Sequence, residues 1–73
     1  MKSLGEVKME FRGADALRSD WQKVCGRKFF QELERDPKVK LQMSTNIKVE
    51  EMHSEKIEDE TGTYVLIWGN VYV

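Results

Sequence analysis

The C-terminal segment, residues 63–73, is the run of the chain that is apolar on both of its alternating sets of side chains. Successive side chains of a strand point to opposite faces of a sheet. One set is Val65, Ile67, Gly69, Val71 and Val73. The other set is Tyr64, Leu66, Trp68 and Tyr72. We predict a long strand whose first set faces a core and whose aromatic set faces away from it.

The length of the chain limits it to one small domain. Its 73 residues are 40% hydrophobic, which is enough for one core between two packed layers. The single cysteine, Cys25, excludes an internal disulfide and a zinc site built from several thiolates, and it suits a reducing compartment. The chain has neither an apolar run of membrane-span length nor the apolar core of a signal peptide at its start. We therefore expect one soluble, cytoplasmic domain over residues 1–73.

A strand and a helix are expected in the first half of the chain. Leu4 to Phe11 alternates apolar and charged residues, which predicts a strand with one buried face. Residues 14–35 carry apolar side chains at helical spacing, which predicts one long helix. Asp36 precedes Pro37, and a residue before proline avoids the helical region, so we expect this helix to stop there.

The apolar stripe of this helix changes direction along its length. Its first part ends at Cys25, and the later apolar residues, Phe29, Phe30 and Leu33, are rotated relative to it. Gly26 lies at the change. Either the helix kinks near Gly26, or Phe30 projects from the contact face. We favour a kink with both phenylalanines in the core.

Three further strands are expected in the second half. Lys38 to Met43 alternates again, Ser44 to Asn46 has the composition of a turn, and Ile47 and Val49 begin a strand that fades into acidic residues. Asp59 to Gly62 is a plausible tight turn into the C-terminal strand. The expected fold is α+β, a two-layer sandwich of one long helix packed across a mainly antiparallel, four-stranded sheet.

Charge is distributed unevenly along a chain whose net charge is −1. Residues 41–73 contain six acids against two lysines, and all six acids fall between Glu50 and Glu60. Such a block is either a solvated hairpin end or a docking surface for a basic partner. We take three residues at its end as candidate partner-binding residues: Glu58, Asp59 and Glu60.

Enzymatic and metal-binding arrangements are weak in this sequence. Glu51, His53 and Glu55 project to one side of an extended strand, but a single histidine with mobile carboxylates makes a poor metal site. Cys25 paired with His53 would be a nucleophilic arrangement, yet Cys25 lies on the apolar stripe, where thiols are usually inert. We therefore predict a protein without enzymatic activity, with no catalytic residues, no metal site and no cofactor.

Nucleic-acid binding is the alternative function. Basic residues cluster in the middle of the chain, and aromatic side chains on a sheet can stack on bases. Acids interrupt the same region, however, and the pI of about 5.8 is low for a nucleic-acid-binding domain. The basic residues are Arg12, Arg18, Lys23, Arg27, Lys28, Arg35, Lys38 and Lys40.

A protein-binding module is the function that we favour. The aromatic set of the C-terminal strand, Tyr64, Leu66, Trp68 and Tyr72, would form an apolar island among charged residues, which is the usual anatomy of an interface. The opposing interpretation is that the stems of neighbouring lysines cover the rings. We expect a regulator, an inhibitor (a virus-encoded one included) or a subunit of an assembly. Its partner would be another protein or a second copy of the chain in a homodimer, and no membrane is expected.

Overall fold

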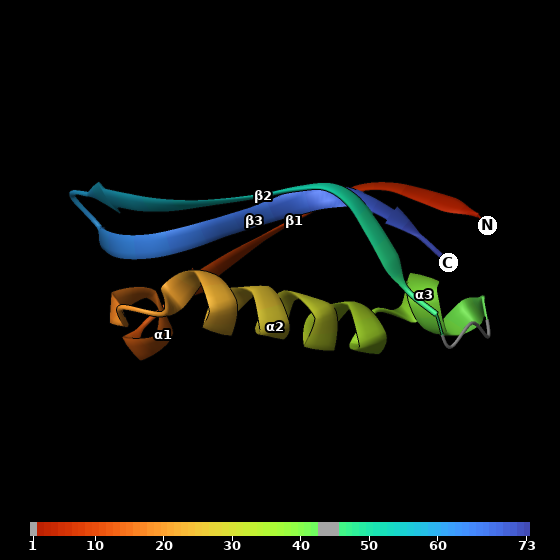
Figure 1. Cartoon of the computed structure of the whole chain (residues 1–73), viewed down its shortest axis with the longest axis horizontal. Helices are drawn as coiled ribbons and strands as arrows, with labels where there is room; N and C mark the ends of the chain where they lie inside the picture. The colour runs from red at the N-terminus through yellow and green to blue at the C-terminus, as the bar shows by residue number, and fades with distance from the viewer. Residues whose placement is uncertain (1, 43–45) are drawn as a thin grey trace.

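The computed structural model describes residues 2–42 and 46–73, which form two layers with helices on one face of a sheet (Figure 1). The predicted turn at Ser44 and Thr45 lies outside the described residues. In the described part, the sheet has three antiparallel strands in the order β1-β3-β2. The elements are β1 (Ser3–Arg12), α1 (Ala14–Leu17), α2 (Trp21–Arg35), α3 (Pro37–Leu41), β2 (Lys48–Asp59) and β3 (Gly62–Tyr72).

The α+β class is confirmed, but the predicted strand over Lys38–Met43 is wrong over its described residues, which form α3 instead. Asp36 is the N-cap of α3, and its Oδ1 accepts a hydrogen bond from the backbone N–H of Lys38 at 2.8 Å. Pro37 occupies the first turn, where a missing N–H costs nothing. The Asp-Pro pair therefore ends one helix and also begins the next. Val39 is buried and Leu41 is 78% exposed, as a helix allows and a one-sided strand does not.

The predicted single helix over residues 14–35 is also wrong, because the chain breaks between α1 and α2. Arg18 Nε donates to Asp20 Oδ1 at 2.7 Å within this break, and Asp20 is the N-cap residue of α2. The ion pair of Lys28 with Asp15 then joins α2 to α1. Leu17, at the end of α1, is 67% exposed and does not belong to the buried stripe.

The helix α2 runs through Gly26 without interruption, and the kink that we predicted there stays a prediction. Its buried residues, Cys25, Phe29 and Leu33, recur every four positions on one face. Phe30 is partly buried against the same core, and its ring meets that of Phe29 edge to face with centroids 6.1 Å apart. Positions four apart advance by about 40° around the helix axis, so the rotation of the stripe lies within α2 itself.

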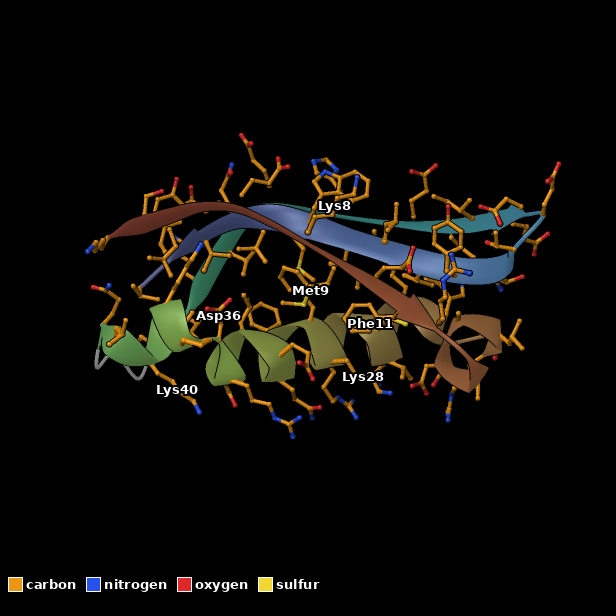
Figure 2. All side chains as sticks on the ribbon, turned by 180° about the vertical axis from the view of Figure 1, so that it is seen from behind. Lys8, Met9, Phe11, Lys28, Asp36 and Lys40 are labelled. Carbon is orange, nitrogen blue, oxygen red and sulfur yellow. The ribbon has the colours of Figure 1, made fainter. Side chains whose placement is uncertain are left out.

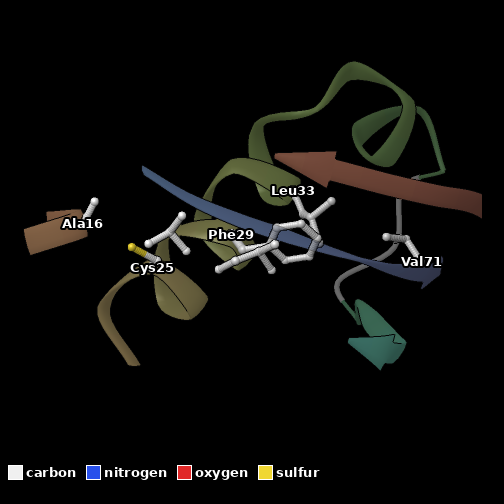
Figure 3. Close-up of a cluster of buried hydrophobic side chains, with 7 residues drawn as sticks. Ala16, Cys25, Phe29, Leu33 and Val71 are labelled. Carbon is white, nitrogen blue, oxygen red and sulfur yellow. The ribbon is translucent and has the colours of Figure 1, made fainter. Parts of the chain in front are cut away.

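The core lies between α2 and the inner face of the sheet, which we define as the face toward the helices (Figure 3). The predicted inward set of the last strand is confirmed, because Val65, Ile67 and Val71 are fully buried. The remaining members of the cluster are Ala16, Cys25, Phe29 and Leu33. This assignment leaves the alternate side chains of β3 on the opposite side, which we call the outer face.

The strand β2 is bulged where it passes Gly69. Glu50 pairs with Asn70 and His53 pairs with Trp68, so two residues of β2 stand opposite the single residue Gly69. Glu51, within the bulge, has φ of 53°, in the left-handed region. A Cβ on Gly69 would lie only 2.5 Å from Val49 Cγ1. Glycine therefore lets β2 approach closely and bend toward α3 at this point (Figure 1).

Candidate protein-binding surface

The aromatic set predicted as a binding site lies in one line along the middle strand of the sheet. Tyr64, Leu66, Trp68 and Tyr72 alternate with the buried residues of β3, so they stand on the outer face, and each is half-buried. β1 and β2 flank this line on its two sides. Each ring is therefore surrounded by side chains of two neighbouring strands, in a register that the strand pairing fixes.

Trp68 stands at the centre of the outer face between Lys8 and His53, its partners across β1 and β2. Lys8 Nζ lies 5.0 Å from the centroid of the indole. The His53 ring stacks on the indole with centroids 5.6 Å apart and an interplanar angle of 25°. Figure 2 shows Lys8 on the side of the sheet away from the helices. These two contacts partly cover the indole and hold it in one orientation.

Carboxylates occupy the rows on either side of Trp68. Leu66 lies between Glu10 and Glu55 in the pairing register, and Asn70 lies between Glu6 and Glu50. All four acids are exposed. The cross-strand rows before and after that of Trp68 thus have a glutamate on β1 and a glutamate on β2. The indole therefore has a carboxylate at each of its four diagonal neighbours.

Tyr64 lies in a hydrogen-bonded network at the hairpin end of the outer face. The Arg12 guanidinium lies 4.3 Å from the centroid of the Tyr64 ring, and it donates to Glu10 at 3.0 Å and to Thr61 Oγ1 at 3.1 Å. The hydrogen bond to Glu10 raises the pKa of Arg12 above its ordinary value. The hydrogen bond of the Tyr64 hydroxyl to Asp59 raises the pKa of Tyr64.

The three acidic candidates occupy different positions. Asp59 closes the β2–β3 turn by accepting hydrogen bonds from the Thr61 hydroxyl and from its N–H, the latter at 2.8 Å, and these bonds lower the pKa of Asp59. Glu60 is exposed in the turn, and Glu58 is exposed on the alternation opposite to Asp59. Asp59 therefore has a structural role, and Glu58 and Glu60 remain as surface acids.

The positive charge predicted for nucleic-acid binding lies mainly in the other layer. The helical segment, residues 14–42, holds seven of the twelve Lys and Arg residues against five acids. The hairpin of β2 and β3 with its turn holds six acids against two lysines. The helices cover the inner face of the sheet (Figure 1). The alternation of β3 puts the aromatic side chains on the outer face, so the basic helical layer and these side chains are on opposite sides of the domain.

His53 belongs to this surface in a way that the sequence analysis missed. We considered it only as a metal ligand or as a partner of Cys25, whereas it stacks on Trp68 and Cys25 is buried on the other side of the sheet. The bulge opposite Gly69 decides this, because an unbulged strand would put Met52 across from Trp68. A glycine inside a long apolar strand was the available signal.

Comparisons with protein-family models, with curated proteins and with solved structures gave no match to this chain. Within residues 2–42 and 46–73, the helices fall short of the length and apolar character needed to cross a bilayer.

Proposed function

We propose that this protein is a small, non-enzymatic binding module whose outer sheet face docks a protein segment bearing basic residues next to an apolar group. Trp68 is the anchor of the contact. The observation that carries this proposal is the position of the indole: half-buried at the centre of the face, fixed by Lys8 and His53 and framed by carboxylates. Regulation, inhibition or assembly would follow from occupancy of this face.

Pre-organisation of the indole favours binding. An interface side chain that is mobile before binding loses rotamer freedom when it docks, which costs about 0.5–1.5 kcal/mol. The flanking contacts of Lys8 and His53 have already restricted Trp68 in the free chain. Aromatic anchors at the centre of an interface, ringed by polar residues, are also where binding energy concentrates.

The charge pattern defines the chemistry of the partner. Glu10 and Glu55 flank Leu66, and Glu6 and Glu50 flank Asn70, so a lysine or arginine adjacent to the docked apolar group would meet a carboxylate in either direction. Glu58 and Glu60 add two exposed acids at the hairpin end, Glu60 in the turn and Glu58 on the alternation of the inner face. Such complementarity mainly raises the association rate and selects the partner. Nucleic acid is less suited, because its phosphates would face these carboxylates.

The test compares two neighbouring residues of β3. Trp68→Ala should weaken binding of the partner by about tenfold or more while leaving the chain folded, as expected for an interface anchor. Ile67→Ala should instead lower the free energy of unfolding by about 2–5 kcal/mol through a core cavity. Urea denaturation measures the stability of both variants, and affinity chromatography of a native extract followed by titration of the purified partner measures binding.

Controls make the comparison specific. Leu17→Ala removes an exposed apolar side chain from the helical side and should leave binding unchanged. Replacing Glu58 and Glu60 together by glutamine should slow association and flatten its salt dependence without changing the fold. If the retained protein binds the Trp68→Ala variant as well as the parent chain, the outer face is not the site. Retention on immobilised oligonucleotides that falls steeply with salt would support nucleic-acid binding instead.

A further inference from the structure

The two edges of the sheet differ in how they are protected from pairing. β2 carries the bulge opposite Gly69 and a strongly acidic sequence, both of which oppose the addition of another strand. β1 pairs with β3 in continuous register from Gly5 to Arg12, and its other edge is open in the described part of the chain. Four charged residues, two of each sign, alternate along the outer side of β1. The open edge of β1 is therefore the part of the sheet that can accept a strand.

We propose that a second copy of this chain pairs with the β1 edge, antiparallel and centred on Met9, to give a two-fold symmetric dimer with a continuous six-stranded sheet. This contact lies at the β1 edge and shares Glu6, Lys8 and Glu10 with the outer-face site proposed above, whereas Glu50 and Glu55 on the β2 side of that site take no part in it. The occupant is identified by the charges of β1, in which Glu6, Lys8, Glu10 and Arg12 alternate in sign along one face. When two copies of β1 run antiparallel, this alternation can place opposite charges across from each other. A two-fold symmetric interface requires this kind of self-complementary surface.

The charges of β1 select one register among the symmetric antiparallel alignments of this strand with its copy. Centring on Met9 places Glu6 opposite Arg12 and Lys8 opposite Glu10 of the partner copy, so that every outer pair is an opposite-charge pair. Centring on Lys8 would place Glu6 opposite Glu10, and centring on Glu10 would place Lys8 opposite Arg12. Like charges directly opposite each other destabilise a strand pair.

Centring on Val7 or on Phe11 leaves one complementary outer pair in place of two. It also moves the contact toward the irregular pairing near Gly5 or past the end of β1 at Arg12. A shift that exchanges odd and even positions would turn apolar side chains to the outer face. The alignment centred on Met9 is thus the one that pairs all four charges.

The inner side of the same edge supports the contact. A groove of about 600 Å³ opens between β1 and α2, with Met9 and Phe11 on the strand side. Both residues are only half-buried in the single chain and point toward α2 (Figure 2). In the Met9-centred register, the partner's Met9 and Val7 would lie beside this groove and cover it. The helix side of the groove has the neutral Gln31 and charged residues of both signs, which a symmetric contact can use: Lys28, Glu32 and Arg35.

The experiment uses two charge exchanges, Lys8→Glu and Glu10→Lys, measured by sedimentation equilibrium on the full chain. The parent should show a concentration-dependent mass that rises to twice 8.6 kDa. In either variant alone, the Lys8–Glu10 pair becomes a like-charge pair twice over, once for each copy, and dimerisation should weaken by about tenfold or more. Mixed in equal amounts, the two variants should form a heterodimer, because glutamate at 8 in one chain then meets lysine at 10 in the other.

The rescue by mixing keeps the test independent of folding defects, since two unfolded variants could not restore a dimer. A parent that remains monomeric at millimolar concentration would overturn the proposal. So would a dimer that both exchanges leave intact, or one that the mixture fails to restore. If Trp68→Ala dissociates the dimer and both charge exchanges leave it intact, the contact lies on the outer face. That result would also overturn the proposal of pairing through β1. The assay contains only this chain, so its outcome does not depend on the partner proposed for the outer face.

Discussion

Gly69→Ala is expected to destabilise the protein, although alanine is the better strand residue. A Cβ at this position would lie 2.5 Å from Val49 Cγ1, 3.2 Å from the Glu50 carbonyl oxygen and 3.2 Å from Met52 Cα. Two of these three atoms belong to the backbone of the bulge, so a side-chain rotation cannot relieve them. Overpacking of a core typically costs about 1–3 kcal/mol, and the rigid neighbours place this site toward the upper end.

Urea denaturation of the parent and of Gly69→Ala measures this cost, and Val49→Ala supplies the partner for a double-mutant cycle. Removing the Val49 methyl groups should relieve the closest contact, so the double variant should be less destabilised than the sum of the two single variants, by about 0.5 kcal/mol or more. A stable Gly69→Ala variant, or costs that simply add, would refute the close approach of β2 to β3. The placement of His53 against Trp68 would then lose its cause.

Two further predictions concern a helix glycine with space for a side chain and a turn carboxylate that accepts hydrogen bonds. Gly26→Ala should raise the free energy of unfolding by about 1 kcal/mol, because its Cβ would meet only Met52 Cε at 3.8 Å and alanine is the better helix former; a loss in the same denaturation assay would reveal a helix that needs glycine there. Asp59→Asn should lower stability at neutral pH and match the parent in strong acid. The hydrogen bonds from Thr61 lower the pKa of the Asp59 carboxyl group. The carboxylate therefore stabilises the fold above its ordinary pKa, and this stabilisation is lost as pH falls through the lowered pKa. Denaturation curves at a series of pH values for both proteins measure this convergence, and a constant difference down to strong acid would contradict it.

The sheet was more predictable from the sequence than the helical layer, and the reason is physical. A strand with one buried face must alternate, so the pattern of residues 4–11 and the apolar set of the last strand indicated both strands and the buried side of the last one. Short helices carry too few residues to display a period. Val39 and Leu41 are two apart, which fits a strand, and the decisive information was the capping of α3 by Asp36.

The sequence contained a local signal for the break between α1 and α2, which helix propensity alone does not reveal. Asp20, directly before Trp21, is a residue type that favours the N-cap position, although its side chain makes no cap hydrogen bond here. Arg18 pairs with Asp20 within the break, a contact between residues that would not face each other on a continuous helix. Treating residues 14–35 as one helix therefore placed Leu17 in the buried stripe, whereas its side chain is 67% exposed.

The aromatic line of the candidate site followed directly from the two-residue period, but its surroundings did not. Lys8 and His53 reach Trp68 through the order β1-β3-β2, in which the last strand lies between the other two. Sequence order alone would place β2 and β3 together and leave β1 unassigned. The bulge, which depends on a contact between Gly69 and Val49, sets the residue that faces the indole.

The two proposed surfaces would act together, because pairing through β1 joins the outer faces of two copies and leaves the carboxylates on the β2 side, Glu50 and Glu55, outside the strand contact. In the six-stranded sheet, three strand spacings separate the two copies of β3, and the Met9-centred register offsets the two Trp68 rows by two residues along the strands. The two Trp68 side chains would therefore lie about 16 Å apart on one continuous face. A partner with two basic segments could then engage both copies, and the second contact would form at an effective concentration set by the linker between the segments. A chain carrying Glu10→Lys would lose this avidity along with the dimer. Glu10→Lys would also weaken the contact with a single basic segment, because it puts an ammonium group beside Leu66 and removes the ion pair with Arg12. The loss of affinity for a partner with two segments should exceed the loss for a partner with one segment, and the difference measures the contribution of the β1 edge.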